Sequence, residues 1–202
     1  MELGVYSFGD LQPAIDGNNG TTAEAIRNLY AAGLHAEAVG LDFFGVGEHH
    51  LKEMPASSPG TILAALGAVT KSIKLGSTST ILGTDDPVRV YQQFATANII
   101  SGGRVEIAVG RGSSLETFPL FGYKMQDYAV LNAEKFDLLM QINHNENVQW
   151  SGKYRPTING MDIVPRPERG LTIWVSTGGS EEPSIRAGKN GWPIFYGIID
   201  QK

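Results

Sequence analysis

The sequence contains no cysteine among its 202 residues. That absence excludes disulfide frameworks, thiol nucleophiles and cysteine-ligated metal centres. The sequence also has no run of basic residues, and 16 Lys+Arg against 21 Asp+Glu give a formal charge of −5. A mildly acidic chain without a basic cluster is a poor candidate for nonspecific binding to nucleic acid or to anionic membranes.

Long apolar stretches are missing as well, since none approaches the roughly 20 residues that a transmembrane helix needs. Residues 1–6 have neither the basic region nor the apolar core of a signal peptide. Together with the lack of cysteine, these features lead us to expect a cytoplasmic protein. What the chain has in plenty is glycine, 25 residues of it, set among alternating strand and helix signals.

Six short apolar or alternating segments predict strands, at residues 3–8, 43–47, 73–77, 105–110, 171–176 and 193–199. Helical spacing predicts helices between them, at residues 21–40, 59–69, 88–100, 126–143 and 181–189. Thr21 and Glu24 form a capping box, and Asp86 is an N-cap that precedes a proline. The helix at 126–143 places Lys135 in an otherwise apolar stripe, and residues 150–170 are too irregular to assign.

This alternation predicts a parallel sheet with crossover helices, because parallel strands need such connections. The period alone leaves open whether the sheet is doubly wound or closed into a barrel. Glycines gather at the carboxyl ends of the predicted strands, which is the ligand-binding edge in both architectures. No repeat or linker divides the chain, so we expect one domain over residues 1–202.

Two adjacent histidines, His49 and His50, follow the second predicted strand. Adjacent strand residues point to opposite faces, so only one imidazole can readily face a central cavity. There it would transfer a proton near neutral pH, although a purely structural histidine fits the same tripeptide. A metal site is disfavoured, because no two histidines show the i, i+4 ligand spacing.

Gly110, Arg111 and Gly112 follow the fourth predicted strand. Glycines allow close backbone approach and a guanidinium suits a phosphate, but a pair between Arg111 and a carboxylate fits equally. The third glycine of a dinucleotide fingerprint is absent, and the next residues, which include Ser113 and Ser114, lead into an aromatic loop; a Rossmann site is therefore rejected.

A second glycine-rich turn, Gly178-Gly179-Ser180, leads from the fifth predicted strand into a helix, a plausible anion site. Glu181 and Glu182 in its first turn oppose an anion there. The hydroxyls of residues 78–80 suit either a heteroaromatic ligand or the loop backbone. The aromatic residues at 118–123 suit an apolar pocket wall or, as we prefer, packing of the loop itself.

Taken in order, six segments of the chain resemble the bacterial luciferase-like, flavin-dependent monooxygenase family. They are residues 41–50, 86–90, 101–106, 109–112, 119–123 and 186–191, and the resemblance extends over essentially the whole chain. It implies a (β/α)8 TIM-barrel fold with FMN across the carboxyl ends of the strands. It also implies that His49 is the active-site histidine and that Thr78 and Ser79 join in a cis peptide beneath the flavin ring.

The same resemblance implies a cofactor-phosphate site formed by Gly110, Arg111 and Gly112 with the turn at residues 178–180. One departure stands out, because Ala129 occupies the place of a second phosphate-binding arginine. The implied reaction uses reduced FMN, supplied by a separate flavin reductase, and O2 to oxygenate a small organic substrate. An F420-dependent hydride transfer and a non-catalytic flavin-binding protein are the alternatives. The family implies a homodimer.

A complete barrel of this type has about 250 residues. Only six strands are counted in these 202 residues, so we expect a barrel truncated after about six β/α units, with strands 7 and 8 absent. A fragment of a longer enzyme is preferred over a natural short form. In either case the first and sixth strands would be unpaired edges.

Overall fold

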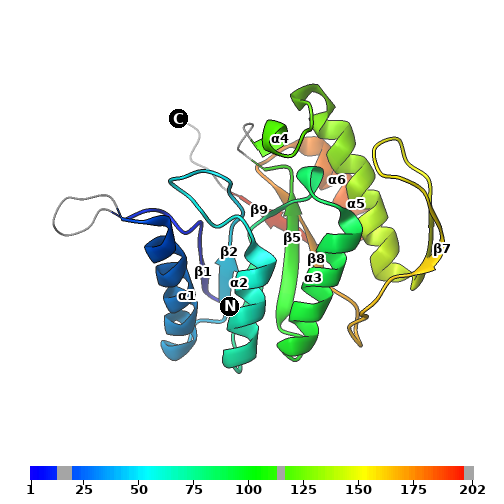
Figure 1. The fold of residues 1–202 in the computed structure, drawn as a ribbon. Helices are drawn as coiled ribbons and strands as arrows, with labels where there is room; N and C mark the ends of the chain where they lie inside the picture. Colours follow the sequence, from blue (N-terminus) through cyan, green and yellow to red (C-terminus); the bar gives the residue numbers. More distant parts are fainter. Residues whose placement is uncertain (13–19, 113–116, 198–202) are drawn as a thin grey trace.

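The computed structural model describes residues 1–12, 20–112 and 117–197. Within them, six parallel strands form one sheet in the order β1-β2-β3-β5-β8-β9, and the short β4 also pairs with β5. The strand order follows the chain order without the reversal of a doubly wound sheet, and the sheet curls as in a β/α barrel (Figure 1). The strands are β1 Gly4–Ser7, β2 Phe43–Val46, β3 Lys74–Ser77, β4 Thr80–Ile81, β5 Val105–Gly110, β8 Ile173–Thr177 and β9 Ile194–Tyr196.

Helices connect successive strands at the positions that the sequence predicts. The long ones are α1 Thr22–Ala38, α2 Pro59–Val69, α3 Pro87–Ile100, α5 Tyr128–His144 and α6 Glu181–Asn190. Short turns of helix, absent from the prediction, are η1 Leu82–Thr84, α4 Thr117–Leu120 and η2 Met125–Asp127.

Local hydrogen bonds fix where two of these helices begin. At α1 the Thr21 hydroxyl accepts from Glu24 N at 3.2 Å while the Glu24 carboxylate accepts from Thr21 N at 2.8 Å. At α3 the Asp86 carboxylate accepts from Val88 N at 2.9 Å. The predicted capping box and N-cap are both confirmed.

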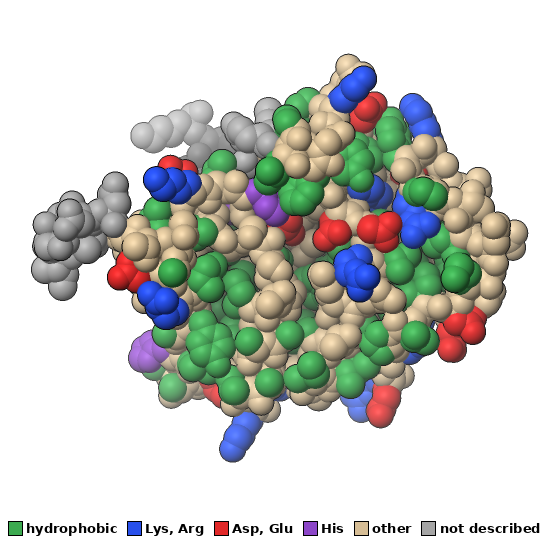
Figure 2. All heavy atoms as spheres, viewed as in Figure 1, with side chains coloured by type: hydrophobic (Ala, Val, Ile, Leu, Met, Phe, Trp, Pro, Cys, Tyr) green, Lys and Arg blue, Asp and Glu red, His purple; other side chains and the backbone are tan. Residues whose placement is uncertain are grey.

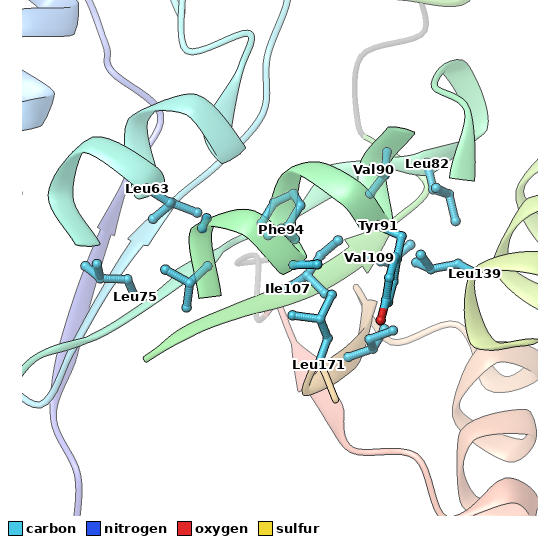
Figure 3. Packing of buried hydrophobic residues seen from close by; sticks show 14 of the residues in the cluster. Leu63, Leu75, Leu82, Val90, Tyr91, Phe94, Ile107, Val109, Leu139 and Leu171 are labelled. Carbon is cyan, nitrogen blue, oxygen red and sulfur yellow. The ribbon is translucent and has the colours of Figure 1, made fainter. Parts of the chain in front are cut away.

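The hydrophobic core lies between the sheet and its helices. Tyr91 and Phe94 of α3 lie against Ile107 and Val109 of β5 (Figure 3), and all four are buried. Alternate strand residues point to opposite faces, so the same strands turn their other side chains into the curl. One charged residue belongs to the buried stripe, because Lys135 of α5 is only 2% exposed.

The inner face of the curl is polar and aromatic. Phe43, Lys74, Glu106, Trp174 and Phe195 line a shallow hollow of about 190 Å³ there. Trp174 Nε1 donates to Glu106 Oε2 at 2.7 Å, which joins β5 to β8 across this face. A barrel interior is filled by such inward side chains, and here they lie on an open sheet.

The sheet does not close within the described residues. There β1 pairs only with β2, and β9 pairs only with β8. Side chains along these edges are exposed, with Val5 at 46% and Tyr196 at 54%. The described residues therefore form an open half-barrel with two unpaired edges.

The segment that the sequence could not assign contains an antiparallel hairpin, β6 Asn147–Trp150 and β7 Ile158–Asp162. Its connecting loop is held by Glu134 of α5, whose carboxylate accepts from the backbone N–H groups of residues 153–155. No periodic signal marks such a loop, because it is ordered by a side chain about 20 residues away. Among the described residues, no helix has both the length and the apolar character to cross a membrane.

Candidate functional site

A cavity of about 770 Å³ lies at the carboxyl ends of the parallel strands. This is within the range of cofactor and substrate pockets. All but one of the nine sequence-predicted site residues line it, namely His49, Thr78, Ser79, Gly110, Arg111, Gly112, Gly178 and Ser180. The ninth, Gly179, lies in the turn between Gly178 and Ser180 and is not a lining residue.

His49 is buried in this cavity at 9% exposure, and its ring packs edge-on against Phe8 at 4.7 Å. Its Nδ1 atom has no hydrogen-bond partner among the described residues. Burial lowers the pKa of His49, while the charges of Asp10 and Glu48 oppose that shift. Burial thus favours the neutral imidazole, and its Nδ1 atom is left without a partner by the described residues.

His50 does not line the cavity and instead contacts Glu48. Its Nε2 atom lies 2.8 Å from Glu48 Oε1, and its ring packs against Phe121 at 5.0 Å. The expectation that one of the two histidines faces the cavity agrees with this arrangement. Glu48, to which the sequence assigned no role, also lines the cavity. Its position directly before His49 is the sequence feature that could have pointed to it.

The segment after β3 forms one wall of the cavity. The peptide bond between Thr78 and Ser79 is cis, as the resemblance implied. Thr78 is buried, and its Oγ1 atom has no partner among the described residues. The hydroxyl of the preceding Ser77 instead donates to Ala108 O at 3.0 Å, so Ser77 serves the strand backbone, whereas the Thr78 hydroxyl lies beside Gly45 without a partner among the described residues.

Glycines let the strands approach this wall closely. A Cβ added to Gly110 would overlap Ser79 Oγ, and one added to Gly45 would lie 2.6 Å from Thr78 Cγ2. Gly112 has a φ of +78° and would place a Cβ 3.0 Å from Ile81. Gly110 and Gly112 therefore make room for neighbouring parts of the chain itself, in addition to any ligand.

Arg111 lines the same cavity, where it joins the two glycine-rich turns. Its Nη2 atom donates to Ser180 Oγ at 2.8 Å, and its guanidinium lies 5.4 Å from the ring centroid of Tyr128. Among the described residues no carboxylate forms an ion pair with Arg111, so the carboxylate pairing that the sequence left open is not seen. The cation remains available to an anionic ligand.

The turn at residues 178–180 leads directly into α6. Gly179 has a φ of +100°, a conformation that favours glycine, and a Cβ on Gly178 would meet nothing closer than 4.0 Å. This leaves open space beside the amino terminus of α6, where the helix dipole favours a negative charge. The exposed Glu181 and Glu182 of the first turn counteract that preference.

The aromatic residues at 118–123, in the loop after β5, serve packing. Phe118 is buried against Tyr128 at 5.4 Å, and Phe121 contacts His50. Neither lines the cavity, which agrees with the packing interpretation. Ser113 and Ser114, which follow Gly112, lie outside the described residues.

The cavity fits a phosphate-bearing flavin in its chemistry. It has a cationic end at Arg111, open space at Gly178, and unpartnered buried polar atoms at His49 and Thr78. Buried polar atoms are rarely left without partners, so a ligand with matching donors and acceptors is expected here.

Residues 1–201 match the family model for luciferase-like monooxygenases. The chain belongs to this family. Among curated relatives it is similar to an F420-dependent glucose-6-phosphate dehydrogenase of Amycolatopsis mediterranei, with 28% identity over 76% of this chain and 48% of the relative. The chain spans about half the length of the curated relatives it matches.

Solved structures of luciferase-like enzymes share the fold. The monooxygenase RslO1 from Streptomyces bottropensis aligns with a TM-score of 0.84 at 20% identity, over 96% of this chain and 59% of that one. The oxygenating constituent of 3,6-diketocamphane monooxygenase from Pseudomonas putida, in complex with FMN, aligns with a TM-score of 0.79 at 18% identity, over 96% and 56%. This likeness supports the barrel-type fold, of which the described residues form an open half-barrel.

Proposed function

We propose that this chain forms the flavin-binding part of a luciferase-like monooxygenase that oxygenates a small organic substrate with reduced FMN and O2. The cavity at the strand ends supports this proposal most directly, because it combines the Arg111 cation with a buried histidine whose Nδ1 atom has no partner among the described residues. The family's activity belongs to proteins about twice as long, so the activity of this chain by itself is part of the proposal.

In this proposal Arg111, Ser180 and the turn at Gly178 and Gly179 bind the cofactor phosphate. Thr78, Ser79, Gly110 and Gly112 form the surface beside the ring system. Bound reduced flavin would supply the electrons that activate O2. The protein's own contribution is to orient the cofactor and to exclude water from the reacting atoms.

His49 would hold or accept a proton at Nδ1, the atom that has no partner among the described residues. Replacing His49 by alanine is expected to lower the oxygenation rate by about 100-fold or more, the usual contribution of a general acid–base group. Single-turnover kinetics with photoreduced FMN measure this. Replacing His35, an exposed histidine of α1, is the control and should leave the rate unchanged. An unchanged rate in His49→Ala would remove this role.

F420-dependent hydride transfer is the second candidate, supported by the F420-dependent dehydrogenases among the relatives. Absorbance titrations with FMN and with F420 separate the two, and oxygen consumption by the photoreduced FMN complex tests oxygenation. Tight FMN binding without turnover would favour a non-catalytic flavin-binding protein. Failure to bind either cofactor at tens of micromolar would contradict both enzymatic proposals.

A separate flavin reductase would supply the reduced cofactor.

A homodimer is proposed through the face that carries α2. That helix has no charged residue, and four of its residues are exposed, namely Thr61, Ala65, Ala68 and Val69. Figure 2 shows apolar side chains gathered on the face that α1, α2 and α3 present. The native mass of wild type and of an Ala65→Arg variant tests the dimer, which the arginine should disrupt.

A further inference from the structure

A buried lysine lies behind the cavity wall. Lys135 of α5 is 2% exposed, and its Nζ donates to Gly83 O at 2.7 Å and to Tyr123 Oη at 3.1 Å. The ammonium also lies 4.2 Å from the centroid of the Tyr123 ring. Burying an ammonium group is unfavourable unless its donors are satisfied, so a lysine here needs the contacts it makes. Lys135 does not line the cavity.

A partly buried carboxylate, that of Glu48, holds the same stretch of chain from the other side. Glu48 Oε2 accepts from Ile81 N at 2.9 Å, and Glu48 N donates to Ser79 O at 3.2 Å. The second carboxylate oxygen, Oε1, lies 2.8 Å from His50 Nε2. Its hydrogen bonds therefore connect the segment that bears both histidines to the segment that forms the cavity wall.

The two charged groups enclose a short segment. Ser79 and Ile81 line the cavity and are bound by Glu48, whereas Gly83, two residues further on, is bound by Lys135. The contacts continue from His50 to Phe121 and from Tyr123 back to Lys135, in the loop before α5. Hydrogen bonds that involve a charged group are stronger than neutral ones. Here they form most of a circuit that the ring contact between His50 and Phe121 completes.

We propose that Glu48 and Lys135 are positioning residues that hold the wall at residues 79–83 in the shape that accepts the cofactor. This inference rests on the proposed flavin-binding function of the cavity. Neither residue needs to take part in the reaction for this role. A wall that is already ordered loses less conformational entropy when the ligand binds, so affinity rises. Both residues act through backbone groups of the wall.

Lys135→Met tests the proposal, because methionine has a similar length but no donor. In the flavin-free protein, the rate of backbone amide hydrogen exchange at residues 78–84 is expected to rise. The affinity for FMN is expected to fall at least tenfold, and the visible circular dichroism of the bound flavin to change. Arg166→Met is the matched control, since Arg166 donates to Ile142 O at 2.6 Å and Asn143 O at 2.9 Å, away from the cavity. It should lower the melting temperature and change neither readout.

Unchanged exchange of residues 78–84 in a folded Lys135→Met protein would overturn the proposal. So would a loss of FMN affinity in Arg166→Met equal to that in Lys135→Met. If Lys135→Met does not fold, Glu48→Gln decides by the same two readouts, because glutamine keeps the shape and loses the charge. If the wild type binds no flavin, the proposed function fails. The comparison of hydrogen exchange between wild type and Lys135→Met still tests whether Lys135 orders the wall.

Discussion

Two glutamates far apart in the chain each bind three consecutive backbone N–H groups. Glu37 of α1 accepts from residues 71–73 before β3, and Glu134 of α5 accepts from residues 153–155 in the hairpin loop. Hydrogen bonds to the charged form lower the pKa of a carboxyl group. For Glu37 they lower the pKa from 4.5 to about 2. Each glutamate thereby holds a loop that has no regular secondary structure.

Glu37→Gln should destabilise the protein at neutral pH by about 1 kcal/mol, a value reduced by solvent screening of this partly exposed side chain. The folded-state pKa is depressed, so the stabilisation is present above the unfolded value of 4.5 and is lost as the pH falls toward about 2. Urea unfolding at pH 7 and at pH 3 measures this. The gap between wild type and variant should narrow at pH 3, and a constant gap would contradict the assignment.

Gly110→Ala and Gly178→Ala should behave differently, although both glycines line the cavity. The added methyl at Gly110 overlaps Ser79, and such overpacking costs roughly 1–3 kcal/mol. At Gly178 the methyl enters open space. We expect Gly110→Ala to lower both the melting temperature and FMN affinity, and Gly178→Ala to lower FMN affinity alone. Equal melting temperatures for the two variants would contradict this explanation.

At the scale of elements, α3 connects several parts of the half-barrel. Its N-cap Asp86 accepts from Val88 N, and Asp86 Oδ2 also lies 3.1 Å from Arg155 Nε in the hairpin loop. Its buried face supplies Tyr91 and Phe94 to the core (Figure 3). The start of α3 follows η1, so the cap also fixes the chain that leaves the cavity wall.

Asp86→Ala should cost about 1 kcal/mol, the usual value for a lost N-cap. Asp86→Asn is the matched control, because its amide oxygen still caps the helix while the charge that pairs with Arg155 is gone. Since that ion pair is partly exposed, its loss should cost less than about 1 kcal/mol. Chemical denaturation gives both values, and an equal cost for the two variants would assign the effect to the ion pair.

At the scale of the whole molecule, the open sheet leaves two edges without partners among the described residues. Unpaired strands at a sheet edge are templates for association. Exposed apolar residues along β1 and just before it, Val5 at 46% and Leu3 at 56%, add to this tendency. On the inner face of the curl, Phe43, Trp174 and Phe195 are only partly buried.

This chain, studied alone, should associate in a concentration-dependent way, and Val5→Lys should suppress the association. A charged residue on an edge strand opposes pairing with another chain. Light scattering across a dilution series measures the mass. Val39→Lys is the control, because Val39 is 58% exposed at the end of α1 and lies on no strand. Equal suppression by both variants would assign the effect to general solubility.

Much of the fold was predictable because its signals are local. Strand alternation, helix spacing and the caps at Thr21 and Asp86 depend on residues within one or two turns of each other. The hairpin at β6 and β7 was missed because Glu134 orders its loop from about 20 residues away. The same reason explains Lys135, which the sequence placed in an apolar stripe but could not connect to Gly83.

The sequence by itself determined the alternating strands and helices, the ligand-binding edge and the residue types gathered there. Periodicity left open whether the sheet is curled or doubly wound, and only the family resemblance implied a barrel. The tertiary structure shows the curled sheet, places His49 at the cavity while His50 contacts Glu48, and brings Arg111 to Ser180. These outcomes depend on pairs such as Glu48 with Ile81, 33 residues apart, and Arg111 with Ser180, 69 residues apart. Local periodicity carries no information about such pairs, because folding alone brings their partners together.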